Sequence, residues 1–304
     1  MRSAIRFRET LRRCVSTGKA RVHTFPRFEG GIPEFRDAYF KVESPVLFSK
    51  TSILEPIPAI RKWFLPSSSA DQTLELNYNY LAQYSSTNVP IEITRFSKTG
   101  DIQFDRIGGP LQLFLEWSKD AVAGTDYSKL TRLYIAQCSI PDLPNGMKAD
   151  LRTPTLVKEA GKGDVYASSI WMGVPPTYTP LHRDPNPNLF MQLAGDKTVR
   201  VFPPDIGKAI FRQVQERVMS ETGSSQCSSH MRGEEMMTGK ERQLLESYTW
   251  DDHSDQTVHE SAFEAKVGPG EGLFIPKGWW HSIKGVGGGI NASVSFTVCL
   301  TAGV

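Results

Sequence analysis

From residue 131 onward, glycine and proline divide the chain into many short apolar segments. Segments of about four to eight residues bounded by turn residues are typical of β-strands, and a close series of them predicts a β-sandwich or barrel rather than a parallel α/β sheet. Two helical patterns interrupt the series within residues 205–261, and we expect this insertion to fold over one end of the barrel. The predicted strands are residues 133–137, 165–172, 179–183, 189–193, 198–202, 262–267, 272–275, 280–284 and 292–300.

The region upstream of this series mixes helical and strand patterns and predicts an α/β extension of the barrel. Residues 90–96 alternate apolar and polar side chains as a strand does, and residues 102–107 predict a returning strand. Residues 110–121 place their apolar side chains on one helical face. The other elements predicted here are a strand at 44–48, a helix at 55–64 that ends before Pro66, and a helix at 74–84.

The first 28 residues form a basic leader. They carry eight basic side chains and one acid, Glu9, so the leader has a charge of +7 and the remaining 276 residues sum to −5. A segment rich in Arg, Ser and Thr and poor in acids resembles a mitochondrial transit peptide, which predicts a mitochondrial protein. The alternatives are a basic tail or a nuclear-import arm on a protein of the cytoplasm or nucleus. The acidic remainder argues against a nucleic-acid groove as the main working surface.

The cysteines and the hydropathy exclude further classes. Cys14, Cys138, Cys227 and Cys299 are scattered without a CxxC pair. This spacing argues against a disulfide scaffold or a structural zinc site and favours a reducing compartment. No uninterrupted apolar run approaches the ~18 residues that a membrane-spanning helix needs, so we expect no membrane insertion.

Two short motifs, 99 positions apart, combine residues that bind metals: His182-Arg183-Asp184 and Trp280-His281. Side chains on a strand alternate with period two, so a strand carrying the first motif places His182 and Asp184 on the same face. A second strand then delivers His281. Two imidazoles and one carboxylate on one face of a divalent metal leave coordination positions open, which is the pattern of non-haem Fe(II) oxygenases. The sequence therefore predicts a metal site of His182, Asp184 and His281.

The His-Arg-Asp motif also matches other kinds of site. His-Arg-Asp also spells the catalytic triplet of protein kinases, but a kinase requires Asn five residues after the Asp, where this chain has Leu189. A kinase also requires a Gly-rich loop upstream, and none precedes the motif. A lone His-x-Asp pair is more often structural than metal-binding. His253 and His259, close to Asp251, form a second group of potential ligands, which we assign to the surface.

Several further motifs stand in order around the predicted ligands: Leu133-Tyr-Ile-Ala-Gln137, Thr179-Pro-Leu-His-Arg-Asp-Pro185, Asn188-Leu-Phe-Met-Gln192, Gly195-Asp-Lys197, Val201-Phe-Pro-Pro204, Gly270-Glu-Gly-Leu-Phe-Ile-Pro-Lys-Gly-Trp-Trp-His281 and Ser293-Val-Ser-Phe296. Together they resemble the Jumonji-C oxygenases, cupin-like proteins that depend on Fe(II) and 2-oxoglutarate. The resemblance is strongest to the small single-domain protein hydroxylases of that family.

This resemblance implies a mainly β fold with added helices. Its core is a double-stranded β-helix of the cupin or jelly-roll type, preceded by the N-terminal α/β region and interrupted by the helical insertion near 205–261. The implied organisation is one oxygenase domain over residues 29–304, with the metal-binding core at 131–304.

The resemblance also implies roles for individual residues. His182, Asp184 and His281 are expected to hold Fe(II), and Lys197 to bind the distal carboxylate of 2-oxoglutarate. The remaining implied contacts are hydrogen bonds from Thr179 and Tyr134 to that cosubstrate and a place for Asn188 beside its metal-binding end. Trp171, Trp279 and Trp280 are suited to building a dry wall around such a site, and ordinary core packing is an equal alternative for each of them.

The implied activity is that of a dioxygenase that consumes O2 and 2-oxoglutarate, releases succinate and CO2, and hydroxylates a side chain of a protein or peptide. N-methyl-lysine demethylation and RNA modification are alternatives within the family. A catalytically silent cupin-like binding protein and a metal-dependent isomerase are alternatives outside it, although silent relatives usually lack a ligand and such isomerases use more His. The sequence leaves the substrate and the oligomeric state open, and the end of the chain at Val304, directly after the last strand, favours a monomer.

Overall fold

The computed structural model of the protein describes residues 22–50, 54–67, 73–97, 101–161, 163–223, 233–251 and 260–298. Most of the basic leader and the His253 and His259 group lie outside the described residues, so mitochondrial import and a surface metal group stay predictions. Within the described ranges, no helix combines the length and the apolar character needed to cross a membrane.

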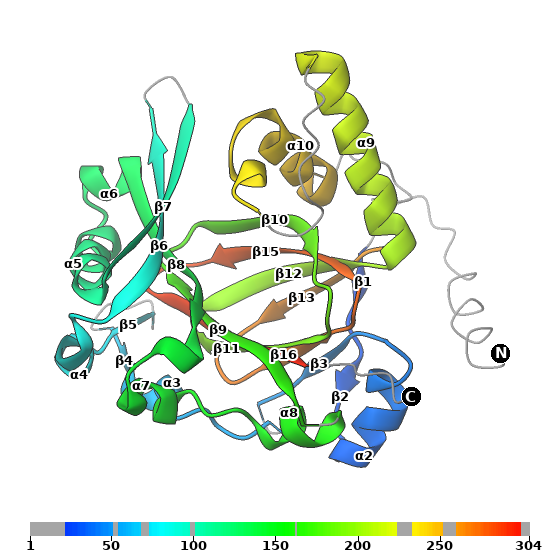
Figure 1. Ribbon diagram of the computed structural model, residues 1–304, viewed down its shortest axis with the longest axis horizontal. Helices are drawn as coiled ribbons and strands as arrows, with labels where there is room; N and C mark the ends of the chain where they lie inside the picture. The colour runs from blue at the N-terminus through cyan, green and yellow to red at the C-terminus, as the bar shows by residue number, and fades with distance from the viewer. Residues whose placement is uncertain are drawn as a thin grey trace.

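Two β-sheets face each other and form the body of the molecule (Figure 1). From β9 to β16 the chain crosses from one sheet to the other after each strand. The exception is β12 and β13, which are neighbours in the same sheet. This path is that of a double-stranded β-helix, which confirms the predicted fold class. The five-stranded sheet contains β1 (His23–Thr24), β13 (Phe263–Val267), β12 (Asp196–Phe202), β15 (Trp280–Val286) and β10 (Thr177–Arg183), in that order.

The second sheet has nine strands because the N-terminal region extends it at both edges. In order, it contains β2 (Arg27–Phe28), β3 (Val46–Phe48), β14 (Gly272–Ile275), β11 (Asn188–Ala194), β16 (Asn291–Val298), β9 (Val165–Gly173), β8 (Thr131–Ser139), β6 (Asn88–Phe96) and β7 (Ile102–Pro110).

Alternation along the strands separates the space between the sheets from the two outer faces. On β12, Val199 and Val201 pack between the sheets with Phe190 and Ile275, whereas Phe202 packs on the outside. The space between the sheets is thus apolar on one side of the barrel. Burial of such side chains contributes about 1.5–3 kcal/mol each relative to exposure.

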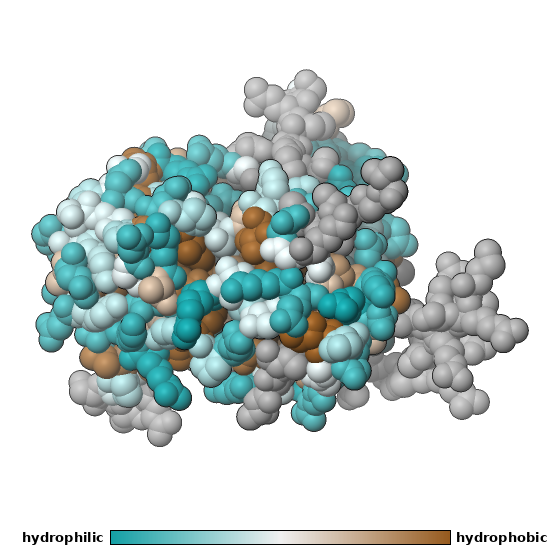
Figure 2. All heavy atoms as spheres, turned by 60° about the horizontal axis from the view of Figure 1, so that its bottom comes forward, coloured by the Kyte–Doolittle hydropathy of each residue, from teal (hydrophilic) through white to brown (hydrophobic). Residues whose placement is uncertain are grey.

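Short helices cover the outer face of the nine-stranded sheet and bury the largest apolar cluster of the molecule. Figure 2, which turns the bottom of Figure 1 toward the viewer, shows hydrophobic side chains only in small separate patches on a mostly hydrophilic face. The helices of this region are α2 (Ile32–Phe35), the π-helix η1 (Arg36–Phe40), α3 (Ala59–Lys62), α4 (Tyr78–Leu81), η2 (Ala82–Tyr84), α5 (Leu111–Val122), α6 (Asp126–Leu130), η3 (Ile140–Asp142), α7 (Asn145–Asp150) and α8 (Thr155–Ala160).

The insertion lies on the outer face of the five-stranded sheet, so the prediction that it folds over one end of the barrel is wrong. It contains α9 (Pro204–Thr222), η4 (Glu235–Met237) and α10 (Gly239–Trp250). Ile210 and Leu245 from these helices pack on Leu181 and Trp280, which point outward from the sheet. At Gly207 a Cβ atom would come within 2.1 Å of the Trp280 ring, so α9 touches this ring with its backbone.

Two helices predicted upstream are wrong in extent, and for local reasons. Between 55 and 64 only Ala59–Lys62 is helical, and Pro66 ends a strand, β4 (Phe64–Pro66), that pairs with β5 (Leu74–Leu76). Proline is tolerated there because the sheet has only two strands and Pro66 needs no further partner. Between 74 and 84, Asn77 caps α4 by accepting a hydrogen bond from the backbone N–H of Tyr80, which starts the helix late.

Candidate metal centre

His182 and His281 are direct partners across two antiparallel strands. They face each other in the register between β10 and β15, and their ring centroids lie 4.1 Å apart. Both side chains are almost fully buried, with exposed fractions of 6% and 2%. The pairing explains how residues 99 positions apart meet, because neighbouring strands bring opposite residues within side-chain reach.

Backbone carbonyls orient both imidazoles. The Nδ1 of His182 lies 2.9 Å from the Pro180 carbonyl oxygen, and the Nδ1 of His281 lies 3.3 Å from that of Trp279. A carbonyl oxygen only accepts hydrogen bonds, so Nδ1 carries the proton in each neutral ring and Nε2 keeps its lone pair. This is the arrangement that prepares a histidine to bind a metal through Nε2.

Asp184 completes the group from a position one residue beyond the end of β10. Its Oδ2 lies 3.8 Å from the Nε2 of His281 and accepts a hydrogen bond from the Nδ2 of Asn188 at 3.3 Å. The potential ligand atoms of His182, Asp184 and His281 all lie within 4.8 Å of one another. The structure thus brings the three predicted ligands together, although Asp184 is placed by the turn after the strand and not by the alternation within it.

A cavity of about 150 Å³ extends from this group between the two sheets. All four residues predicted to contact 2-oxoglutarate line it: Tyr134, Thr179, Asn188 and Lys197. Thr179 and His182 are three positions apart on β10 and would face opposite ways on a regular strand. A register shift between them lets both side chains face the cavity.

Lys197 lies on β12 four positions before Val201, the partner of His281 across the sheet, so it lines the cavity away from the metal group, and it is 2% exposed. Its Nζ donates to the Oγ of Ser293 at 2.6 Å and to the hydroxyl of Tyr134 at 3.3 Å. Among the described residues, no carboxylate lies within ion-pair distance of this ammonium group. Burial lowers the pKa of Lys197 to about 7.

Ser293 lies in the cavity wall although the sequence predicted no role for it, and only one of the three tryptophans predicted to form the wall lines the cavity. Ser293 carries no chemical signal of its own in the sequence, and only the inward alternation of β16 places its hydroxyl against Lys197. Trp171 lines the cavity, as predicted. Trp279 instead donates its Nε1–H to the Glu43 carbonyl, and Trp280 packs outward, so neither forms the predicted wall.

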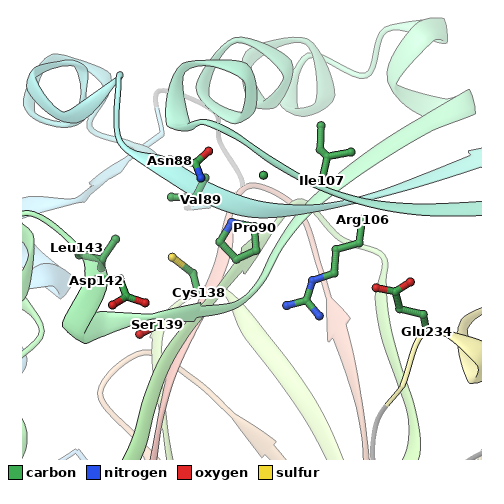
Figure 3. A pocket seen from close by; sticks show the side chains of 11 residues that line it. Asn88, Val89, Pro90, Arg106, Ile107, Cys138, Ser139, Asp142, Leu143 and Glu234 are labelled. Carbon is green, nitrogen blue, oxygen red and sulfur yellow. The ribbon is translucent and has the colours of Figure 1, made fainter.

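A larger cavity, of about 420 Å³, lies outside the barrel between β6, β7 and β8. Figure 3 shows Arg106 and Glu234 at one side of it and Cys138, Ser139 and Asp142 at the other. It contains none of the predicted ligands. Burial raises the pKa of the Cys138 thiol to about 11, which makes it a weak nucleophile at neutral pH. This cavity therefore offers no reactive group comparable to the metal centre.

Comparison with known proteins supports the assignment of the fold. The family model described as a cupin-like domain matches residues 33–297. The chain is 26% identical over 269 residues to Lysine-specific demethylase JMJ30 of Arabidopsis thaliana, covering 85% of this chain and 50% of that protein. It is 22% identical over 270 residues to Lysine-specific demethylase 8 of Xenopus tropicalis, covering 87% and 50%.

A third relative is Jumonji C domain-containing protein 5 of Drosophila melanogaster, 23% identical over 269 residues, which are 83% of this chain and 54% of that protein. The chain thus spans about half the length of the curated relatives it matches. The match of the family model covers most of the chain, including all three residues of the metal group. The chain therefore belongs to the cupin-like, Jumonji-C family.

Proposed function

We propose that the protein is an Fe(II)- and 2-oxoglutarate-dependent dioxygenase that hydroxylates a side chain of a polypeptide. The observation that carries this proposal is one cavity with two chemically different ends. His182, Asp184 and His281 gather within 4.8 Å at one end, and Lys197 lies four register positions from the level of His281 along the same sheet. Such a cavity suits a small molecule that chelates a metal through one end and carries a carboxylate at the other.

The residues of the cavity fit both Fe(II) and 2-oxoglutarate. Two imidazole nitrogens and one carboxylate form the facial donor set of non-haem Fe(II) enzymes. The Oδ1 of Asn188 is buried beside Asp184 without a hydrogen-bond partner among the described residues, so it can accept a bond from a group bound at the metal. A cavity of about 150 Å³ is well below the ~300 Å³ typical of sites for larger ligands, which suits a five-carbon dicarboxylate.

Each side chain then has a definable task. When bound, iron supplies the O2 chemistry, and the protein supplies binding, orientation and electrostatics. The Pro180 and Trp279 carbonyls hold the Nδ1 protons of the two histidines, so that both Nε2 atoms stay available. The Lys197 ammonium binds the distal carboxylate of 2-oxoglutarate, together with Tyr134 and Thr179. Trp171 excludes water from the wall of the cavity.

N-methyl-lysine demethylation is the second candidate, because two of the relatives are named lysine-specific demethylases. Both activities begin with hydroxylation of a C–H bond. In demethylation the bond belongs to an N-methyl group, and the N-hydroxymethyl product breaks down to formaldehyde and the amine. They differ in product, so formaldehyde release separates them. A silent binding protein is disfavoured because all three ligands and Lys197 are present.

The test is anaerobic addition of Fe(II) and then 2-oxoglutarate to the purified full chain. We expect a weak visible charge-transfer band that appears only when both are present. In air, succinate formation should then require both components. Protein that retains iron and yet shows no band with 2-oxoglutarate would contradict the cosubstrate assignment. Replacement of Fe(II) by Zn(II), which has no such transition, serves as the control for protein-only absorption.

A further inference from the structure

A second cavity, of about 310 Å³, adjoins the cofactor cavity and combines an apolar lining with five charged side chains. It lies between the inner face of β6 and β8 on one side and β10, β15 and α10 on the other. Tyr134 lines both cavities, with its hydroxyl bonded to Lys197 in the first. Tyr134 is therefore a wall that the two cavities share.

The charged side chains of this second cavity do not balance. It contains three basic residues, Arg132, Arg242 and Lys284, and two acids, Glu92 and Glu246. Glu246 is shared, because it lies 2.9 Å from the Nζ of Lys284 and 3.4 Å from the guanidinium of Arg242. One positive charge is thus in excess.

Arg132 is the basic residue of this cavity that does not share Glu246. Its guanidinium donates to the Pro176 carbonyl at 3.2 Å and stacks on the Phe96 ring at 4.7 Å. Within the described residues, no carboxylate lies within ion-pair distance of it. Burial, and then the like charge of Arg242, lower the pKa of Arg132.

The walls around Arg132 define what the counter-ion can be. Phe96 and Tyr178 supply aromatic faces, and Arg242 stacks over Tyr178 with its guanidinium 5.0 Å from the ring centroid. Aromatic walls favour an anion carried on an apolar stem, and a guanidinium fork matches a carboxylate in two parallel hydrogen bonds. A single excess charge matches a monoanion better than a phosphate, which carries close to two negative charges at neutral pH.

We propose that this second cavity binds an acidic side chain, Glu or Asp, of the polypeptide substrate, close to the residue that is oxidised. The inference rests on the proposed function, since it takes the neighbouring cavity as the cofactor site. The carboxylate lies between Arg132 and Arg242, and its position beside Tyr134 restricts it to a residue near the target in the substrate. The site therefore selects sequences by charge, apart from the chemistry at the metal.

The experiment measures binding of three acetylated, amidated tripeptides, Gly-Glu-Gly, Gly-Gln-Gly and Gly-Lys-Gly, and of inorganic phosphate, to the full chain by calorimetry. We expect the Glu peptide to bind about tenfold more tightly than the Gln peptide, a difference of about 1.4 kcal/mol. Arg132→Gln should remove this difference, and Arg242→Gln should reduce it. Arg106→Gln is the matched control, because Arg106 lines the separate cavity of Figure 3.

Each outcome decides the proposal. Loss of discrimination in Arg132→Gln with discrimination kept in Arg106→Gln supports it. Equal binding of the Glu and Gln peptides to the unmodified protein, or discrimination that survives both Arg132→Gln and Arg242→Gln, overturns it. Tighter binding of phosphate than of the Glu peptide would assign the cavity to phosphorylated or nucleic-acid ligands instead. The charge-transfer band in the same Arg132→Gln sample reports separately on the cofactor site, so failure of the proposed function is distinguishable from failure of this inference.

Discussion

At the metal end of the cofactor cavity, polar side chains contact one another, whereas at the lysine end none of the described residues provides a counter-ion for Lys197. His182, Asp184 and His281 meet within a few ångströms, with backbone carbonyls and Asn188 holding them in place. Within the described part of the chain, Lys197 donates hydrogen bonds to two hydroxyl groups, those of Tyr134 and Ser293. The three side chains of the metal end are thus in position before a ligand binds. At the lysine end, the positive charge of Lys197 is compensated only when an anion binds. The difference separates a preorganised site from one that gains stability on binding.

The largest expected effect comes from breaking the metal end. Asp184→Ala should reduce iron retention by at least about 100-fold, since loss of outer contacts alone typically costs 10–100-fold. Succinate formation should be abolished. Iron content after desalting and succinate by chromatography are the measurements. Asp196→Ala, a change at an acid that lies outside the metal group, is the control. Turnover retained in Asp184→Ala would refute its assignment as a ligand.

Breaking the lysine end should separate the two functions of the cavity. Lys197→Met should weaken 2-oxoglutarate binding by roughly 30-fold or more, because loss of one partner of a buried charge pair typically costs 2–5 kcal/mol. Iron retention should be unchanged. Calorimetric titration of the iron-loaded protein measures the first, and metal analysis the second. Equal 2-oxoglutarate affinity in both proteins would show that another group binds the distal carboxylate.

The same variant should unfold at a higher temperature than the unmodified protein when no cosubstrate is present. The folded protein lowers the pKa of Lys197 to about 7 from an ordinary value of 10.5. Below pH 7 the folded state must hold a buried charge, so the stability cost is fully present there. It declines as pH rises from 7 toward 10.5. The gain in melting temperature from Lys197→Met should therefore be largest at pH 6 and smaller at pH 9, as measured by calorimetry.

The lowered pKa also predicts coupled proton uptake. At pH 8 most Lys197 side chains of the ligand-free protein are neutral, and binding of a carboxylate favours the charged form. 2-Oxoglutarate should therefore bind with uptake of up to one proton at pH 8 and almost none at pH 6. Its affinity should fall by up to about tenfold per pH unit above 7. Titrations in two buffers of different ionisation enthalpy measure the uptake, and an identical heat in both at pH 8 would contradict it.

The smallest effect is expected for Ser293→Ala. This change removes a hydroxyl 2.6 Å from the Nζ of Lys197 and leaves the charge in place. The 2-oxoglutarate dissociation constant should change by about threefold to tenfold, which corresponds to one hydrogen bond. A change as large as that in Lys197→Met would mean that Ser293 positions the lysine. Ser295→Ala, on the same strand and also lining the cavity, is the matched control.

Local patterns in the sequence predicted a β-sandwich or barrel and the grouping of His182, Asp184 and His281, and the family resemblance narrowed the fold to a double-stranded β-helix. Period-two alternation and turn residues mark the strands, and His182 and Asp184 are close in the chain. The reason given for Asp184 was wrong in detail, since it lies beyond the strand. The pairing of His182 with His281 and the contact of Lys197 with Ser293 depend on strand register, which no local pattern contains.

The errors have the same origin. The predicted placement of the insertion was wrong because an amphipathic helix pattern predicts that one face of the helix is buried. The pattern does not predict which surface of the protein covers that face. The strand at Pro66 and the late start of α4 were missed because a pairing partner and a cap outweighed the helical spacing of the apolar residues. Arg132 carried no signal in the sequence, since only the fold reveals that none of the described acids forms an ion pair with it.

The contact of Gly207 with the Trp280 ring has a consequence for how this chain can change over time. Trp280 immediately precedes His281, so the first turn of α9 packs on the side chain next to a candidate ligand. Any side chain at position 207 would push on that ring. At the far end of the helix, Met219 is half-exposed, and a Cβ atom at Gly223 would meet no described atom within 4 Å. The insertion can therefore diversify at its tip to meet new partners, while its base must keep one shape.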